Sequence, residues 1–390
     1  MHLLIRKKTI YYILLLVVYL MPTRISESFL PYSAYVFYIA QFVIGALLIR
    51  EYGLFTKNRF TILFFLFMIT GLPGMFFTYS ASVISYIRYA CWFTSMLGLH
   101  QFYIYASDEE VQHFLKTGKS LLIVTCVLTE LFAMGGEAVL ASGFFWGSKA
   151  ITTQAIIMFV TFAIYYDIKY IGNITLYTMV GYIWSLYFCM FRHSGQGTTM
   201  LLLLLALLLL ELVLKKNTMR IINPLVVLVS LTVAYYLVIT LRFQDFDFAV
   251  KYVTEFLSKD VSLTGRDQIF SGCLKLLNEH IFFGYGFNNT IVNDVLGQRV
   301  MMFNTAHNSM LQMLLDFGVI GTTFFIALIY NVLSILKKSG KAENVVLYFS
   351  VIVMFIGGLV NMIIGTNYFW MIASLAIACH FRDNQPIGWE

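Results

Sequence analysis

The chain is organised around the stretch from Arg242 to Gly321, which carries three polar motifs: Thr264-Gly265-Arg266-Asp267, Gly284-Tyr285-Gly286 and Thr305-Ala306-His307-Asn308-Ser309. This stretch begins as a long run without an apolar segment of membrane length. After His307 the sequence becomes apolar again, and Gly318 and Gly321 stand in the apolar run. We therefore expect a large hydrophilic loop between two groups of hydrophobic helices.

Composition places the chain among integral membrane proteins. Hydrophobic residues make up 59% and charged residues 12% of the 390 residues, and this charged share is about half of the roughly 25% usual in soluble domains. Apolar runs of about 18 or more residues recur along the whole length. Because a soluble core cannot absorb so many such runs, we expect an all-α polytopic membrane protein with a single integral membrane domain over residues 1–390.

Hydropathy predicts about twelve transmembrane helices. They lie near residues 9–21, 32–49, 60–79, 81–104, 120–140, 150–166, 171–191, 198–214, 221–241, 317–336, 343–364 and 366–381. One large extracytoplasmic loop, residues 242–306, separates the ninth span from the tenth. The first run follows Arg6-Lys7-Lys8 as a signal peptide would. No small-residue cleavage site follows it, so we expect a retained first span.

The basic residues indicate how the spans are oriented. If the spans simply alternate, all of the basic clusters fall on one side of the membrane: Arg6/Lys7/Lys8, Arg50/Lys57/Arg59, Lys116/Lys119, Lys215/Lys216/Arg220, Lys337/Lys338/Lys341 and Arg382. The positive-inside rule makes this side cytoplasmic. Both termini are then cytoplasmic, whereas the loop 242–306 and the turn Arg192–Gly197 face outward. The net charge of +6 has the same origin and requires no nucleic-acid partner.

The large loop is expected to carry an amphipathic helix. Thr264 and Asp267 form a capping box that predicts a helix through about Asn278. Its apolar residues share one face, which suits the membrane surface: Ile269, Phe270, Cys273, Leu276 and Leu277. The first turn offers free backbone N–H groups and Arg266, a combination that suits a diphosphate. Pairing of Arg266 with a loop carboxylate or a lipid head group fits the spacing equally well.

His307 is the leading candidate for chemistry in the sequence. It stands beside Asn308, where the loop enters the membrane. Ionisable residues at membrane depth are functional candidates, and histidine is a common general base near neutral pH. An interfacial histidine that bonds to the backbone is the alternative. Gly284-Tyr285-Gly286 has two interpretations, a phosphate loop and a tight turn. The motif alone favours the tight turn, because no Gly-Lys-Ser/Thr follows it and no strand precedes it.

The sequence contains no motif for several kinds of chemistry. There is no Walker motif, dinucleotide fingerprint or Gly-x-Ser-x-Gly elbow. No His/Cys/acid cluster has metal-ligand spacing, and the five cysteines lie far apart. An enzyme built on this chain is therefore expected to use an already activated donor, with no cofactor and no metal ion.

Three motifs together resemble the signature of the O-antigen ligase and Wzy-type polymerase superfamily: Thr264-Gly265-Arg266, Gly284-x-Gly286, and Ala306-His307-Asn308 followed by Gly318-Val319-Ile320-Gly321. The resemblance implies a glycosyltransferase of the GT-C type in the bacterial cytoplasmic membrane. Its donor and acceptor would be undecaprenyl-diphosphate-linked glycans at the outer face. Membrane lipid, a chain-length regulator and a flippase are the further partners that it implies.

The resemblance also implies roles for individual residues. The family's loop arginine falls on Arg266 and its histidine on His307. A second family arginine, in a pattern like Ser-x-Arg-Gly, falls on Gln196 of Ser194-Gly195-Gln196-Gly197. Arg192, one helical turn earlier, and Arg242 are therefore the candidates for that role. The arginines would hold the diphosphate, and His307 would take the proton of the acceptor hydroxyl.

Substrate contacts are expected from four further residues: Gly284, Gly286, Asn308 and Gln196.

Three functions fit these motifs. A polymerase of O-antigen or capsular repeat units is favoured, because the chain is short and has no extra outer domain for a large or protein acceptor. A ligase that moves finished glycan to lipid A core or to protein shares the same motifs. A flippase or other transporter of lipid-linked glycan is the alternative from another class. Transporters of that kind show broken segments in paired positions of two halves, and the sequence has none.

Overall fold

The computed structural model describes residues 2–20, 33–53, 59–77, 83–134, 149–192, 194–214, 218–240, 250–251, 254–255, 266–287, 291–292, 295 and 305–384. These residues form helices joined by turns, and no strand occurs among them. The prediction of an all-α fold is thereby confirmed.

The helices follow the predicted spans closely. Their bounds are α1 His2–Leu20, α3 Ser33–Tyr52, α4 Arg59–Phe77, α5 Val83–Tyr105, α6 Asp108–Met134, α7 Lys149–Tyr166, the π-helical turn η1 Asp167–Ile171, α8 Leu176–Phe191, α9 Gly195–Val213, α10 Thr218–Ile221, α11 Pro224–Thr240, α13 Arg266–Glu279, α14 Ser309–Ser339, α15 Ala342–Gly357 and α16 Asn367–Asn384. Each predicted span coincides with one of these helices.

Among the boundaries that differ from the prediction are the start of α6 and the end of α15. Helix α6 begins at Asp108 rather than near residue 120, because Ser107 and Glu110 form a capping box in which each bonds the other's backbone N–H. Helix α15 ends at Gly357 rather than near residue 364. The following residues, 358–366, are non-helical and connect α15 to α16.

The described part of the chain is a helical membrane protein. Four segments are long and apolar enough to cross a membrane: Tyr35–Tyr52, Ala150–Ile171, Gly195–Val213 and Ser309–Ser339. Further apolar helices are shorter: Thr9–Leu20, Phe60–Phe76, Leu176–Phe191, Pro224–Thr240, Ala342–Gly357 and Asn367–Cys379. Large apolar side chains such as Leu212 and Ile183 are exposed on the outside of the bundle, which suits contact with lipid. That all twelve predicted spans cross the membrane remains a prediction.

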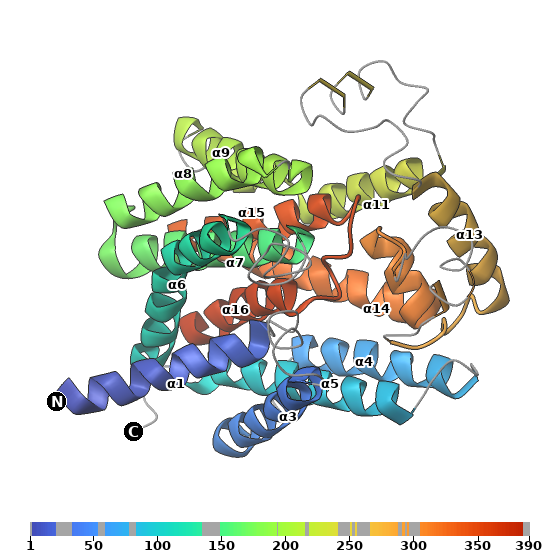
Figure 1. The fold of residues 1–390 in the computed structure, drawn as a ribbon, viewed down its shortest axis with the longest axis horizontal. Helices are drawn as coiled ribbons and strands as arrows, with labels where there is room; N and C mark the ends of the chain where they lie inside the picture. The colour runs from blue at the N-terminus through green and yellow to red at the C-terminus, as the bar shows by residue number, and fades with distance from the viewer. Residues whose placement is uncertain are drawn as a thin grey trace.

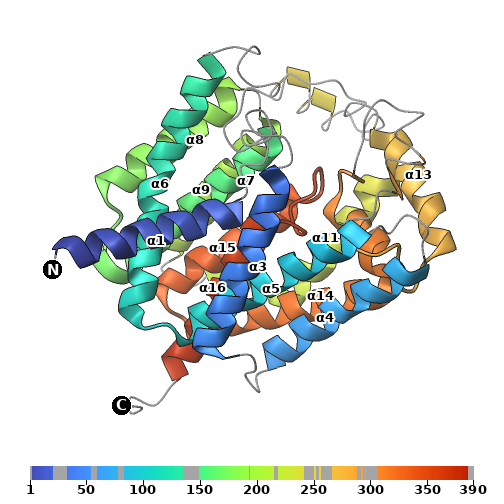
Figure 2. The ribbon, with the colours of Figure 1, turned by 60° about the horizontal axis from the view of Figure 1, so that its bottom comes forward.

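The helices pack in layers around a central group. Figure 1 shows α8 and α9 on one side, α4 and α5 on the opposite side, and α7, α14, α15 and α16 between them. Helix α1 lies against α6, and α3 lies against α5 (Figure 2). Aromatic rings fill the centre, where Trp370 contacts Phe64, Phe67 and Phe325. This central group holds the start of α14, where His307 is found.

Helix α14 is broken at Gly318, whose φ of 63° and ψ of −171° are non-helical. Residues 281–286 dock onto the break through the backbone. Tyr285 N donates to Leu315 O (2.6 Å), and Val319 N donates to Ile281 O (2.9 Å). A Cβ atom on Gly318 would lie 2.2 Å from Phe282 O, so only glycine allows this approach. Residues 281–286 therefore supply hydrogen-bond partners for the backbone groups that lose their partners within the helix at the break.

Candidate functional site

His307 has an unusual backbone conformation. Its φ is 50°, and it is the one non-glycine residue with positive φ among those that the structure describes. The left-handed region is costly for a residue with a Cβ atom and persists only where the surroundings impose it. Such strained positions cluster at active sites. The sequence therefore identified His307 as a candidate, and the structure adds its left-handed backbone conformation.

The residues after His307 hold it in place from the C-terminal side. Asn308 is buried and is the N-cap of α14, where its side chain accepts from Leu311 N (3.0 Å). Its Nδ2 atom donates to Leu359 O (3.0 Å). The next residue, Ser309, donates its backbone N–H to Gly358 O (2.8 Å). The turn of His307 thus rests on the non-helical connection between α15 and α16.

The same connection reaches Gln196, which the resemblance aligns with a second arginine. Ser309 Oγ donates to Asn361 O (2.8 Å), and Asn361 Nδ2 donates to Gln196 Oε1 (3.0 Å). Gln196 Nε2 donates in turn to Gly357 O (3.2 Å). The structure therefore joins Gln196 to the His307 turn through Asn361. Sequence reasoning missed Asn361, although a polar residue inside a predicted span was a usable signal.

Arg192 has a partner that the sequence did not reveal. It is the C-cap of α8, and its Nη2 atom lies 2.9 Å from Glu130 Oε2 on α6. The guanidinium also lies 5.2 Å from the centroid of the Phe191 ring. The side chains of Arg192 and Glu130 are 24% and 21% exposed. Glu130 falls inside the predicted span 120–140, where an isolated carboxylate was the overlooked signal.

Helix α13 has the predicted apolar face but a different partner. Each residue of that face is buried: Ile269, Phe270, Cys273, Leu276 and Leu277. They pack with Leu311 and Leu315 of α14, so the expectation that this face lies on the membrane surface is wrong. The helix docks on protein because Tyr285 Oη donates to Leu276 O (2.8 Å) and ties the following turn to it. Burial raises the pKa of Cys273 to about 12, which keeps the thiol neutral.

The two glycines of the Gly284-Tyr285-Gly286 motif have φ values of 66° and 88°. The structure has the tight turn that was one of the two interpretations of this motif. A Cβ atom on Gly284 would lie 2.3 Å from Leu315 O, and one on Gly286 would lie 2.1 Å from a carbon atom of Met75. The backbone N–H of Gly286 donates to Asp316 O (3.0 Å). These glycines therefore pack α4 and α14 together, and contact with substrate remains a prediction for them.

Two predicted arginines lie partly or wholly outside the described residues. Arg266 is the first residue of α13, as the capping box led us to expect, but the description does not include its side chain. Arg242 and Thr264 are outside the description entirely, as is most of the predicted loop 242–306. The diphosphate contacts of Arg266 and Arg242 remain predictions.

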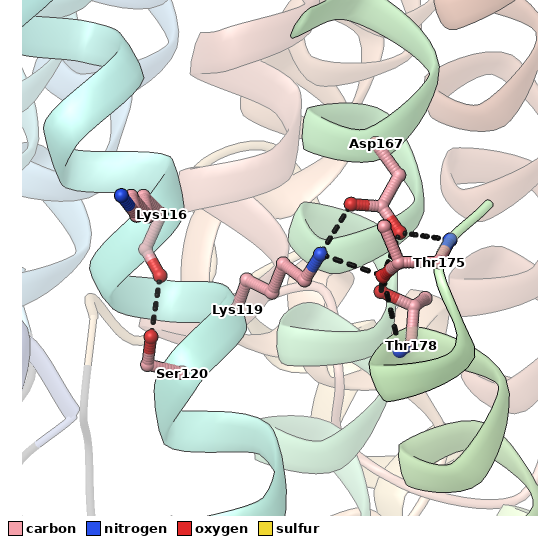
Figure 3. A network of polar contacts seen from close by, with 6 residues as sticks. All are labelled: Lys116, Lys119, Ser120, Asp167, Thr175 and Thr178. Atoms are coloured by element: carbon pink, nitrogen blue, oxygen red, sulfur yellow. Dashed lines mark hydrogen bonds and ion pairs between the residues drawn. The ribbon is translucent and has the colours of Figure 1, made fainter. Parts of the chain in front are cut away.

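A second charged cluster lies elsewhere on α6 (Figure 3). Lys119 Nζ contacts Asp167 Oδ1 and donates to Thr175 Oγ1 (2.8 Å). The other carboxylate oxygen, Asp167 Oδ2, accepts from the backbone N–H and the hydroxyl of Thr175 (2.8 and 2.7 Å). Thr175 is also the N-cap of α8, where it accepts from Thr178 N. The cluster joins α6, η1 and the start of α8.

Comparison with known families supports the resemblance found in the motifs. Residues 180–326 match a family model described as O-antigen ligase. No curated protein and no solved structure matches the chain. The matched region runs from α8 to the middle of α14 and contains Arg192, Gln196, Arg266 and His307. Members of this family are glycosyltransferase-like enzymes of glycan assembly. Over this region the chain is similar to the O-antigen ligase family, which supports the resemblance to the superfamily of O-antigen ligases and Wzy-type polymerases.

Proposed function

We propose that the protein polymerises undecaprenyl-diphosphate-linked repeat units of an O-antigen or capsular polysaccharide. The growing glycan is transferred to a sugar hydroxyl of the next lipid-linked unit at the outer face of the bacterial cytoplasmic membrane. The observation that carries the proposal is the left-handed His307 at the start of the broken helix α14, inside the region that matches the family.

The proposed reaction is a direct displacement. The acceptor oxygen attacks the anomeric carbon of the donor, while the bond from that carbon to the diphosphate oxygen breaks. His307 takes the proton of the acceptor hydroxyl. The prenyl diphosphate leaves with the bonding electron pair, and Arg266 with Arg192 or Arg242 stabilises its charge. The activated donor supplies the driving force, so that neither a metal ion nor a cofactor is required by the proposal.

Other predicted residues take a supporting role in this proposal. The amides of Gln196 and Asn308 and the backbone of the Gly284–Gly286 turn are engaged with protein groups. We place them behind the reacting groups, where they hold the turns that present His307. The proximity of donor and acceptor then contributes to the rate, since a fixed geometry replaces a bimolecular encounter.

The proposal includes a multi-pass topology with both termini in the cytoplasm and the loop 242–306 outside. A reporter fused after Asn278 is expected to be extracytoplasmic, and one fused after Lys341 is expected to be cytoplasmic. Two reporters on the same side would contradict the topology.

His307→Ala tests the proposed base. General-base contributions are about 10²–10⁴-fold, so we expect almost no polymer on a glycan gel, with single lipid-linked units accumulating at the outer face. His280→Ala is the matched control, since His280 follows α13 in the same loop. Normal ladders from a well-expressed His307→Ala protein would exclude the base role.

The lipid-linked pool of the His307 variant separates the three functions. Single units accessible from outside support a polymerase. Long chains that remain on the lipid indicate a ligase, because polymerisation then proceeds without transfer to the final acceptor. Units accessible only from the cytoplasm indicate a flippase.

Arg266→Lys tests the proposed diphosphate site. A guanidinium forms two parallel hydrogen bonds with a phosphate, which an ammonium group does not. We expect Arg266→Lys to lose most of the polymer at normal expression. Near-normal polymer from this variant would make Arg266 a surface charge.

A further inference from the structure

A short hydrogen-bond chain reaches the His307 turn from inside α14. Ala306 N donates to Gln312 Oε1 (2.8 Å), and Gln312 Nε2 donates to Asp316 Oδ1 (2.7 Å). Ala306, Gln312 and Asp316 are 0%, 5% and 1% exposed. Gln312 and Asp316 are four residues apart on α14, so they lie one above the other on one helix face. The chain therefore runs in buried surroundings from Asp316 to the residue before His307.

The backbone N–H of Ala306 determines the direction of this chain. It can only donate, so the amide oxygen of Gln312 faces Ala306 N and its NH₂ group faces Asp316, whose Oδ1 atom accepts. The backbone of Asp316 is itself held, because its carbonyl accepts from Gly286 N (3.0 Å) beside the break at Gly318. The orientation of the Gln312 amide is thus tied to the constrained backbone at the break.

His307 stands between two sets of restraints. Asn308 and Ser309 fix its C-terminal side against the connection 358–366, and the Gln312 amide fixes its N-terminal side through Ala306 N. A left-handed non-glycine residue is strained and persists only where the surrounding structure determines its conformation. The contact with Gln312 supplies the restraint on the side where the loop arrives.

We propose that Gln312 and Asp316 are positioning residues, which hold the His307 turn so that its imidazole meets the acceptor hydroxyl. This proposal rests on the proposed function insofar as His307 acts on substrate. Merely satisfying the buried N–H of Ala306 would require only an acceptor at position 312. A positioning role requires in addition that a hydrogen bond to the side chain at position 316 hold this acceptor in one orientation. Mutations can separate these two requirements.

The experiment reverses the hydrogen bond between the two side chains. Gln312→Glu keeps an acceptor for Ala306 N but removes the donor to Asp316 and places two carboxyl groups together. The double variant Gln312→Glu/Asp316→Asn restores one donor and one acceptor at nearly the same volume. The control is Gln41→Glu, because Gln41 is also fully buried and donates to a backbone carbonyl, Val18 O (3.1 Å), on another pair of helices.

Two readouts are measured on membranes with matched protein levels. The first is glycan polymerisation, and the second is the rate at which diethyl pyrocarbonate modifies His307, followed by peptide mass spectrometry. We expect Gln312→Glu to lower polymerisation by about 10²-fold, the scale of a small misplacement of a reacting group, and to change the modification rate of His307. The double variant should recover most of both, and Gln41→Glu should alter neither the rate nor the modification of His307.

Three outcomes would overturn the proposal. One is wild-type polymerisation and unchanged His307 modification in Gln312→Glu. Another is a double variant no better than the single one. The third is a double variant that fails to accumulate in the membrane, since the reversed bond should fold. The rate at which diethyl pyrocarbonate modifies His307 does not depend on enzymatic activity. It therefore still tests whether Gln312 and Asp316 position His307 if His307→Ala proves active and the proposed function fails.

Discussion

Helix α6 contributes to two ion pairs of low exposure, Lys119–Asp167 and Glu130–Arg192, and the two differ in how completely their polar groups are satisfied. Lys119 and Asp167 are 11% and 0% exposed, and Thr175 completes the contacts of both. Glu130 lies eleven residues after Lys119 on α6, about 16 Å along the helix axis, and shares one contact of 2.9 Å with Arg192 at the end of α8. Arg192 Nε and Glu130 Oε1 are buried, and neither has a hydrogen-bond partner among the described residues.

This difference indicates that the Lys119 cluster is structural, whereas the Arg192 pair has polar atoms that could still bind a ligand. Each polar atom of the Lys119 cluster is engaged within the protein, so a ligand could bind only by breaking it. The Arg192 pair retains an unused donor and an unused acceptor, which is costly in a buried place unless something else binds there. Of the two cations, Arg192 is therefore the one whose contacts support the proposal that it binds the diphosphate.

The largest effect is expected from Lys119→Met. Removal of one partner of a buried ion pair leaves an uncompensated charge on Asp167, which costs about 3–5 kcal/mol. We expect little folded protein and a clearly lower melting temperature in detergent. Lys116→Met is the control, because Lys116 is exposed one turn earlier on the same helix. If Lys119→Met melts like the wild type, the cluster is not structural.

Arg192→Ala is expected to affect activity more than folding. Loss of one group that stabilises developing charge costs about 10²–10³-fold in rate, whereas the partly exposed pair contributes less to stability than the Lys119 cluster. Gln196→Ala is compared in the same polymerisation assay, and we expect it to be milder because its amide bonds to Asn361 and Gly357. A larger loss of polymer in Gln196→Ala than in Arg192→Ala would indicate that Gln196, rather than Arg192, is the second residue that binds the diphosphate.

Glu130→Gln should leave the protein folded and active. The amide oxygen can still accept from Arg192, while the guanidinium loses its counter-charge and attracts an anion more strongly. We expect normal or increased polymer and a lower apparent KM for the lipid-linked donor. Polymer loss equal to that of Arg192→Ala would show that the pair itself, rather than the arginine, is required.

The smallest effect is expected from Asp108→Asn. Asp108 lies 3.3 Å from Lys169, and their side chains are 63% and 21% exposed. Exposed pairs are screened by water and salt, so the loss should be below about 0.5 kcal/mol. A melting temperature shifted as far as in Lys119→Met would show that burial does not set the strength of these pairs.

Much of the fold could be predicted from hydropathy. The positions of the helices follow from the sequence because a bilayer requires helical segments of a certain length and apolarity. Each such segment can be recognised from its own residues. The apolar face of α13 follows from helical periodicity in the same way. The partner of that face did not follow, because an apolar stripe is equally suited to lipid and to the side of α14.

The sequence by itself determined the helical class and the boundaries of most helices, and it predicted the superfamily and the candidate base His307. Only the tertiary structure decided which polar groups meet. Arg192 finds Glu130 across 62 residues, and Asn361 finds Gln196 across 165. Such pairs depend on how each helix is rotated and shifted against its neighbours, which hydropathy leaves open because lipid and protein interiors are both apolar. The left-handed turn of His307 also depends on contacts from two distant segments, so that local sequence could name the residue but not its conformation.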